Sequence, residues 1–169
     1  QGALNINLVT ALHYAPDVRQ AVLDARAAGL TLPIVCNTSG YENAEVVRAM
    51  ADVVDVWLPD FKYADPALAG SLSAAPDYPD VAAAALGAMV ADLREKGGRK
   101  EGPDGRLERG IVVRHLVLPG HADDSCRVLD RVWQICGNDA DLSVMNQYTP
   151  NEACRAAGGP LSHGVSEEE

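Results

Sequence analysis

The sequence lacks the cysteine spacings that mark most zinc and haem sites. Its four cysteines stand at positions 36, 126, 136 and 154, and no two of them form a Cys-x-x-Cys pair. Cys36 falls in an apolar, strand-like run, and Cys126 and Cys136 fall in a helix-like segment. We therefore expect buried free thiols and a reducing, cytoplasmic environment.

Basic residues and long apolar runs are scarce as well. The chain has 14 Lys and Arg residues against 24 Asp and Glu residues, and its net charge is −10. This balance argues against nucleic acid or an anionic membrane as a partner. No apolar run approaches 18 residues, so no membrane span is predicted. Because the sequence opens on Gln1 and soon enters a strand-like segment, we interpret it as a fragment of a longer protein.

The sequence does contain a regular alternation of strand-like and helix-like segments. Short apolar runs predict five strands, at residues 4–9, 32–36, 53–58, 111–118 and 142–146. Helical periodicity and helix-start residues predict helices between them, at residues 16–28, 44–51, 66–72, 79–96 and 126–136. Such alternation gives an α/β fold with parallel strands and right-handed crossovers. Residues 1–150 are therefore predicted to form part of a (β/α) barrel or half of an open sheet.

Two stretches are predicted to lie outside this pattern. Residues 97–110 are charged and contain the turn signal Pro103-Asp104-Gly105, so we expect an exposed loop without a catalytic role. Residues 151–169 are polar, and we expect a truncated or flexible segment with a helix start at 166–169.

Polar side chains lie at or just beyond the carboxyl ends of four of the five predicted strands. The four motifs are Asn37-Thr38-Ser39-Gly40-Tyr41, Pro59-Asp60-Phe61-Lys62-Tyr63, Arg114-His115-Leu116-Val117-Leu118-Pro119-Gly120-His121 and Asn146-Gln147-Tyr148-Thr149-Pro150. In parallel α/β folds the carboxyl ends of the strands meet at one mouth, where ligands bind. The sequence therefore predicts a ligand site built from these motifs.

Lys62 and Asp60 are the most informative pair. They are two residues apart, so they share a face if the strand continues. They could form a surface salt bridge, or Lys62 could act as a Schiff-base nucleophile. The carboxylate of Asp60 argues against the Schiff-base role, because a neighbouring carboxylate favours the charged form of the lysine amine. A cationic anchor for a carboxylate-bearing ligand is therefore the preferred functional interpretation.

The other polar motifs leave alternatives open. Asn37, Thr38 and Ser39 could cap the following helix or bind a polar ligand. Arg114 and His115 interrupt an apolar strand and must point to opposite faces, so the inward one is expected to meet a ligand or a carboxylate. His13, His115 and His121 have no spacing that supports a metal site.

Taken in order, these motifs resemble the activating-enzyme branch of the radical S-adenosylmethionine superfamily, and in particular proteins related to pyruvate formate-lyase activating enzyme. The resemblance runs along nearly the whole chain. It includes Asn5-Ile6-Asn7-Leu8-Val9-Thr10, His13-Tyr14 and Ala75-Pro76-Asp77-Tyr78, together with residues 37–41, 58–63, 114–121 and 145–150.

The resemblance implies the central and C-terminal portion of a partial (β/α) barrel of parallel strands. In this family the open mouth of the barrel holds S-adenosylmethionine on a 4Fe–4S cluster. An electron from a donor such as flavodoxin cleaves the cofactor, and the resulting 5′-deoxyadenosyl radical abstracts hydrogen from a substrate. For activating enzymes that substrate is a glycine on a partner, a glycyl radical enzyme, although another protein substrate is possible.

The resemblance also implies roles for residues of this chain, all in cofactor binding and none in catalysis or metal ligation. Asp60 and Lys62 would lie near the methionyl end of S-adenosylmethionine. Asn37, Thr38 and Ser39 would line the same pocket. The strand Arg114–Leu118, which carries Arg114 and His115, would flank the nucleoside, and Gln147 and Tyr148 would close the far side.

The chain departs from the family pattern in two places. The cluster motif Cys-x-x-x-Cys-x-x-Cys is absent from this sequence, so the chain alone is expected to be inactive. The better-known activating enzymes have Asp-Thr-Asn-Gly where this chain has residues 37–40, so a carboxylate that could help to hold a cation is missing. Two alternatives remain: a barrel lyase that uses Lys62 or Asp60, and a non-catalytic domain that binds a small molecule.

Overall fold

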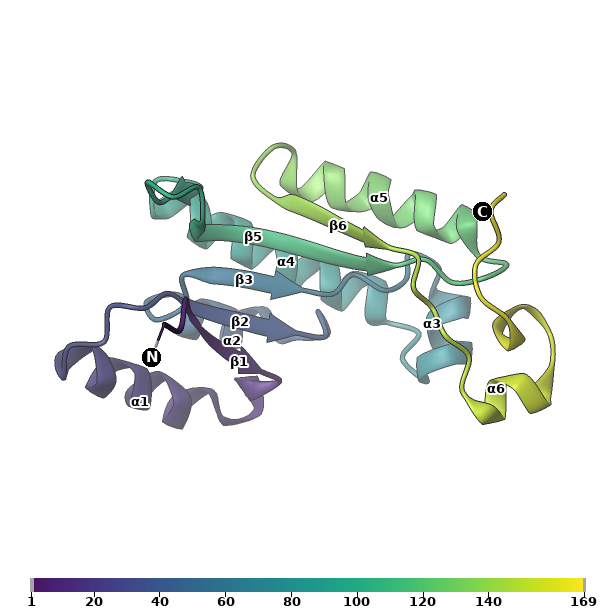
Figure 1. The fold of residues 1–169 in the computed structure, drawn as a ribbon, viewed down its shortest axis with the longest axis horizontal. Helices are drawn as coiled ribbons and strands as arrows, with labels where there is room; N and C mark the ends of the chain where they lie inside the picture. Colours follow the sequence, from purple (N-terminus) through teal and green to yellow (C-terminus); the bar gives the residue numbers. More distant parts are fainter. Residues whose placement is uncertain (1, 169) are drawn as a thin grey trace.

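The chain folds around a mostly parallel sheet in an α/β arrangement (Figure 1), which a computed structural model describes for residues 2–168. Five strands lie parallel and in sequential spatial order, as predicted. They are β1 (Ile6–Val9), β2 (Ile34–Thr38), β3 (Val56–Pro59), β5 (Leu107–Leu116) and β6 (Asp141–Met145). Within the described residues β1 and β6 do not pair with each other, so the sheet is open and no closed barrel forms.

Helices follow the strands where the sequence predicts them. A 3₁₀ turn, η1 (Ala11–Tyr14), leads into the first of the five predicted helices. Proline stands in the first turn of three of the five helices, where its missing N–H costs nothing. The side chains of Asn43 and Asp65 cap the N-terminal ends of the helices that begin at Ala44 and Pro66. The helices are α1 (Ala15–Ala27), α2 (Ala44–Met50), α3 (Pro66–Ser73), α4 (Tyr78–Glu95) and α5 (Ala122–Cys136).

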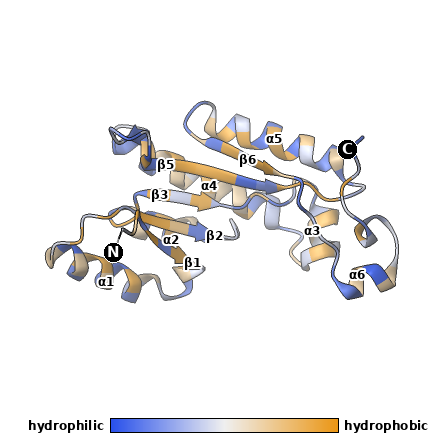
Figure 2. Cartoon of the chain, viewed as in Figure 1, coloured by the Kyte–Doolittle hydropathy of each residue, from blue (hydrophilic) through white to orange (hydrophobic). Residues whose placement is uncertain are grey.

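The two faces of the sheet have different surroundings. Helices α2 and α4 lie behind the strands in Figure 1, and the alternating burial of the strands matches this arrangement. In β5, Val113 and His115 are buried, whereas Val112 and Arg114 on the opposite face are only half-buried. Figure 2 shows the strands as mainly apolar, with polar residues toward the carboxyl ends of β2 and β5.

The core lies between the helix-covered face and the helices. Its largest fully buried side chains include Trp57, Phe61, Met50, Leu86 and Met89. Complete burial of a side chain of this size contributes about 1.5–3 kcal/mol each. Packing between the helices and the apolar face of the sheet therefore stabilises the strands, and the polar residues lie at the ends of these strands.

The charged stretch 97–110 is not simply a loop, so that prediction is wrong. Strand β4 (Lys100–Glu101) pairs antiparallel with the first residues of β5, and residues 107–110 belong to that strand. The predicted turn is present, because Gly105 donates its N–H to Gly102 O at 3.0 Å with a positive φ of 77°. The turn joins β4 to residues 107–110 of β5. These residues are mainly polar, so they gave no alternating apolar signal in the sequence.

The C-terminal segment contains short elements that the sequence did not predict. Helix α6 (Glu152–Ala157) is capped at its N-terminus by Asn151, whose side chain accepts a hydrogen bond from Cys154 N at 2.8 Å. A 3₁₀ turn, η2 (Pro160–Ser162), packs against the strand-exit turn at Gly120, where an added Cβ would lie 2.6 Å from Pro160. The predicted helix start at 166–169 is not helical at residues 166–168, and Glu169 lies outside the described residues.

The thiols are only partly as expected. Cys36 and Cys136 are buried, but Cys154 is half-buried and Cys126 is exposed. Cys126 lies on α5 as predicted, but on its outer side, so the expectation that it is buried is wrong. Among residues 2–168, no helix is both long enough and apolar enough to cross a membrane.

Candidate functional site

A cavity of about 380 Å³ opens at the carboxyl ends of β3, β5 and β6. Its size lies in the range of small-molecule sites. One side of it is charged and the other is apolar. The lining residues are Asp60, Lys62, Tyr63, Arg114, Leu116, Leu118 and Met145.

The charged side of the cavity holds one carboxylate and two cations. Arg114 Nη2 lies 2.7 Å from Asp60 Oδ1, and it also donates to Asn37 Oδ1 at 2.7 Å. Lys62 Nζ lies 3.9 Å from Asp60 Oδ2, which is too long for a hydrogen bond. Asp60 is therefore bound mainly by Arg114, and the lining carries a net charge of +1 in a chain whose total is −10.

The strand register places these side chains together. Asp60 and Arg114 form an isolated parallel bridge just beyond β3, and Phe61 donates its N–H to Arg114 O at 2.8 Å. Asn37 of β2 pairs with Leu58 of β3, two residues before Asp60. Since paired residues of neighbouring strands point to the same side, Asn37, Asp60 and Arg114 share the face that α2 and α4 leave uncovered.

Tyr78 joins the ends of β2 and β3, a role that the sequence analysis missed. Its hydroxyl lies 2.8 Å from Ser39 O and 3.2 Å from Asp60 O, and it accepts a hydrogen bond from Lys62 N at 3.0 Å. Burial raises the pKa of this phenol above its ordinary value. Its ring stacks on Tyr41, with centroids 5.9 Å apart. Tyr78 is therefore a neutral support that fixes the backbone of the cavity wall.

Gly40 allows the loop after β2 to approach the loop after β3. Its φ is +78°, and an added Cβ would lie 2.0 Å from Asp60 O. That distance is far below van der Waals contact, so any side chain would push the loops apart. The same backbone oxygen is near the hydroxyl of Tyr78. The glycine is thus required for the contact between the two loops.

His115 is not brought to the cavity, although it was a candidate cofactor ligand. It points into the helix layer and is buried, with Nδ1 2.8 Å from Phe61 O and Nε2 2.8 Å from Ser125 Oγ. Because a carbonyl only accepts, Nδ1 carries the proton and Nε2 accepts from the serine in the neutral ring. The sequence rule that Arg114 and His115 face opposite sides is confirmed, and His115 serves the core.

Five other candidates also lie outside the cavity lining, and Asn37 among them reaches it through its hydrogen bond with Arg114. Thr38 is buried and its hydroxyl accepts from Gly40 N at 2.9 Å, while Ser39 Oγ accepts from Tyr41 N at 3.3 Å. These hydroxyls hold the turn after β2, and the cap of α2 is instead Asn43. Tyr148 donates to Leu161 O at 2.9 Å, and Gln147 lies near Met145 Sδ at 3.9 Å.

The apolar side of the cavity was predicted only as part of the strand Arg114–Leu118, without naming its lining residues. Leu116 and Leu118 follow Arg114 at intervals of two residues, which is the period of one strand face. Extending that period beyond Arg114 would have identified both leucines. Met145 is paired with Leu116 across β5 and β6. That contact could not be read from the sequence without the register of the two strands.

The cysteines do not gather into a metal-binding group. Among the described residues, no group of three or more His, Cys, Asp or Glu side chains is placed to hold a metal ion. Burial raises the pKa of the Cys36 thiol to about 12 and that of Cys136 to about 11. Because thiolates are the ligands of iron–sulfur clusters, the donor set of this chain does not fit such a cluster.

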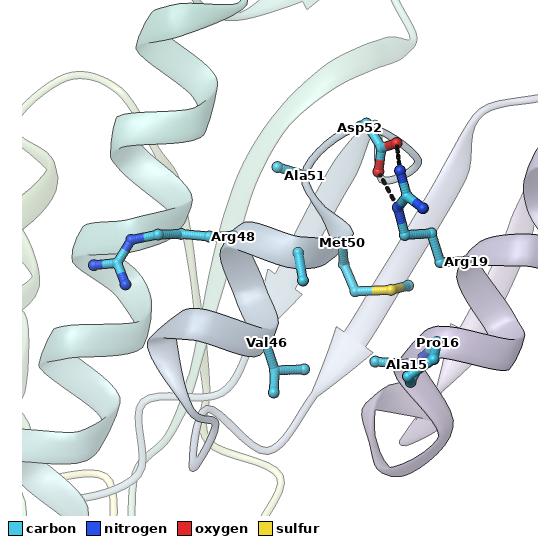
Figure 3. Close-up of a pocket in the computed structure, with 9 residues that line it drawn as sticks. Ala15, Pro16, Arg19, Val46, Arg48, Met50, Ala51 and Asp52 are labelled. Atoms are coloured by element: carbon cyan, nitrogen blue, oxygen red, sulfur yellow. Dashed lines mark hydrogen bonds and ion pairs between the residues drawn. The ribbon is translucent and has the colours of Figure 1, made fainter.

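A larger cavity, of about 720 Å³, lies between α1 and α2 (Figure 3). Arg19 and Asp52 are paired at one end, with Arg19 Nε 2.9 Å from Asp52 Oδ1. Met50 and Val46 point toward the groove in the same view, and Ala15 and Pro16 form its other side. Arg19 and Asp52 neutralise each other, the side chain of Arg48 points away from them in Figure 3, and the remaining lining is mainly apolar. The smaller cavity at the strand ends is therefore the better candidate for chemistry.

No family model matches this chain. Over 122 residues, which are 70% of the chain, the sequence is 26% identical to the uncharacterized protein MJ0674 of Methanocaldococcus jannaschii. The matched stretch is 30% of the length of that protein. The chain thus spans less than a third of this relative.

Proposed function

We propose that this chain is the S-adenosylmethionine-binding portion of a radical S-adenosylmethionine protein of the activating-enzyme type. The cavity at the ends of β3, β5 and β6 is the proposed cofactor site. In this proposal the open sheet is part of a (β/α) barrel, and the uncovered face of the sheet is its interior. The supporting observation is an exposed lysine beside a carboxylate that is already bound by an arginine.

The lining suits the two ends of S-adenosylmethionine. Lys62 is 45% exposed, and its ammonium group can bind the methionyl carboxylate by a charge-assisted hydrogen bond. Leu116, Leu118 and Met145 offer an apolar wall for the nucleoside. On the charged side, Arg114 binds Asp60 and Asn37 accepts a hydrogen bond from Arg114, so in this proposal both act through Asp60 and Arg114 rather than by contact with the cofactor.

S-adenosylmethionine supplies radical chemistry when it is bound beside a reduced iron–sulfur cluster. The cysteines of this chain do not fit that cluster, so its ligands would have to lie elsewhere in the protein. The proposed role of these residues is to bind and orient the cofactor. A glycyl radical enzyme or another protein is the proposed substrate, and a donor such as flavodoxin is the proposed source of electrons.

Calorimetric titration of S-adenosylmethionine into the chain tests this proposal. Lys62→Ala should weaken binding by about ten- to a hundredfold, because loss of one charge-assisted contact costs about 1.5–3 kcal/mol. Lys62→Arg should weaken it less, because the positive charge remains.

Lys100→Ala is the matched control, since Lys100 lies on β4 and pairs with Glu108 at 2.6 Å, away from the cavity. That variant should bind like the unmodified chain. The proposal fails if the chain binds no S-adenosylmethionine, or if Lys62→Ala and Lys100→Ala bind it equally well while both remain folded.

A further inference from the structure

The three charged groups at the cavity are not equivalent partners. Asp60 Oδ1 receives the guanidinium of Arg114 at 2.7 Å, whereas Asp60 Oδ2 and Lys62 Nζ are 3.9 Å apart. The first distance is a charge-assisted hydrogen bond and the second is not a hydrogen bond. The single carboxylate is therefore committed to the arginine.

The backbone explains why the arginine prevails over the lysine. Arg114 and Asp60 form a bridge between neighbouring strands, so their side chains start side by side. The same guanidinium nitrogen also donates to Asn37 Oδ1 at 2.7 Å, which anchors it on a third strand. Its Nε is buried and has no hydrogen-bond partner among the described residues. Within residues 2–168 the ammonium group of Lys62 has no comparable anchor, and Lys62 is the more exposed of the two cations, at 45% against 27%.

We propose that Arg114 is a positioning residue that occupies Asp60 and thereby leaves Lys62 free to bind the carboxylate of a ligand. With Arg114 present, the Asp60, Lys62 and Arg114 set carries a charge of +1. Without it, Asp60 and Lys62 are left as a neutral pair that competes with the ligand. Arg114 thus acts on the ligand through Asp60 and Lys62. The inference rests on the proposed function for the identity of the ligand, but not for the competition between the two cations.

A double-mutant cycle separates this role from direct contact or general support. Arg114→Gln should lower the affinity for S-adenosylmethionine by about tenfold or more. In an Asp60→Asn background, the same substitution should change the affinity by less than about threefold, because there is no carboxylate left to capture Lys62. Arg114→Lys keeps the cation and should retain most of the affinity. Equal losses in both backgrounds would overturn the proposal.

A measurement without ligand tests the same competition. Spectra of protein labelled with ¹⁵N-lysine report the ammonium group of Lys62, which the Lys62→Ala spectrum assigns. Its resonance should move in Arg114→Gln and return in Arg114→Gln/Asp60→Asn. Arg109→Gln, the same change at the other end of β5, should leave it in place.

An unmoved Lys62 resonance in folded Arg114→Gln protein would overturn the proposal even if S-adenosylmethionine binds. The two proposals can also fail separately in the other direction. If the Lys62 resonance moves as expected but the unmodified chain binds no S-adenosylmethionine, the positioning role stands and the proposed function fails. If Arg114→Gln does not fold, the Arg114→Lys and Asp60→Asn proteins decide: an Arg114→Lys protein with Lys62 paired to Asp60 would contradict the proposal.

Discussion

The two faces of β5 show how differently neighbouring residues of one strand can be used. Arg114 faces the uncovered side, where it binds Asp60 and Asn37 at the edge of a cavity. His115, the next residue, faces the helices and is held between Phe61 O and Ser125 Oγ. Both are polar interruptions of an apolar strand. Only the one on the uncovered face is available to a ligand, so the face matters more than the residue type.

The comparison extends to the whole sheet. The helix-covered face supplies the fully buried side chains, and the uncovered face carries the half-buried and charged ones. Changes on the first face should therefore affect mainly the free energy of unfolding. Changes on the second should affect mainly ligand binding.

Phe61 should give the largest effect, because it is fully buried on the helix side and contacts the ring of Tyr78. Phe61→Ala is expected to lower the free energy of unfolding by about 3–5 kcal/mol. Leu58→Ala is the control on the uncovered face, where the side chain is half-buried, and it should cost less than half as much. Urea unfolding of both variants measures the difference. Equal losses would show that the two faces are not distinct in their contribution to stability.

Cys36 should give a smaller effect that appears only in alkali. Burial raises its pKa from 9.0 to about 12, so the unfolded chain loses this proton before the folded one does. Its contribution is present below pH 9 and is lost as the pH rises toward 12, by about 1.4 kcal/mol at pH 10. Cys36→Ala should flatten the fall of stability between pH 8 and pH 10. Cys126→Ala, at an exposed thiol, should leave the slope unchanged, and a slope that both variants share would refute the assignment.

Tyr78 should give the smallest of these effects on stability. Tyr78→Phe keeps the ring in its stack and removes the hydroxyl that contacts Ser39 O and Lys62 N. We expect a loss of roughly 1 kcal/mol, the usual net value of such hydrogen bonds. Tyr41→Phe removes an exposed hydroxyl bonded to Asp77 and should cost less. Thermal unfolding compares the two, and a larger loss for Tyr41→Phe would contradict the role given to Tyr78.

Much of the scaffold could be predicted from the sequence, because each local signal agrees with the fold. The five parallel strands and the five helices follow from the periodicity of apolar residues and from residues that start or end helices. Pro66 at the start of α3 and Gly137 at the end of α5 are examples. The β4 strand could not be found this way, because its residues are polar and its pairing depends on a turn. Helix α6 is short, and only its cap at Asn151 gives a local signal.

The site was predicted less completely than the scaffold. The Asp60 and Lys62 pair could be placed from a spacing of two, and the opposite directions of Arg114 and His115 from strand alternation. The contact between Arg114 and Asp60 depends on the register of β3 and β5, which no local pattern encodes. The role of Tyr78 depends on how α4 packs against the loops that follow β2 and β3, which no local pattern in the sequence predicts.

The central claim is that Lys62 receives the carboxylate of S-adenosylmethionine at the cavity of the uncovered face. Titration of the unmodified chain and of Lys62→Ala with S-adenosylmethionine and with its decarboxylated analogue tests this claim most directly. The unmodified chain should prefer S-adenosylmethionine by about ten- to a hundredfold, and Lys62→Ala should bind the two ligands equally well. A preference that survives in Lys62→Ala, or is absent from the unmodified chain, would contradict the claim.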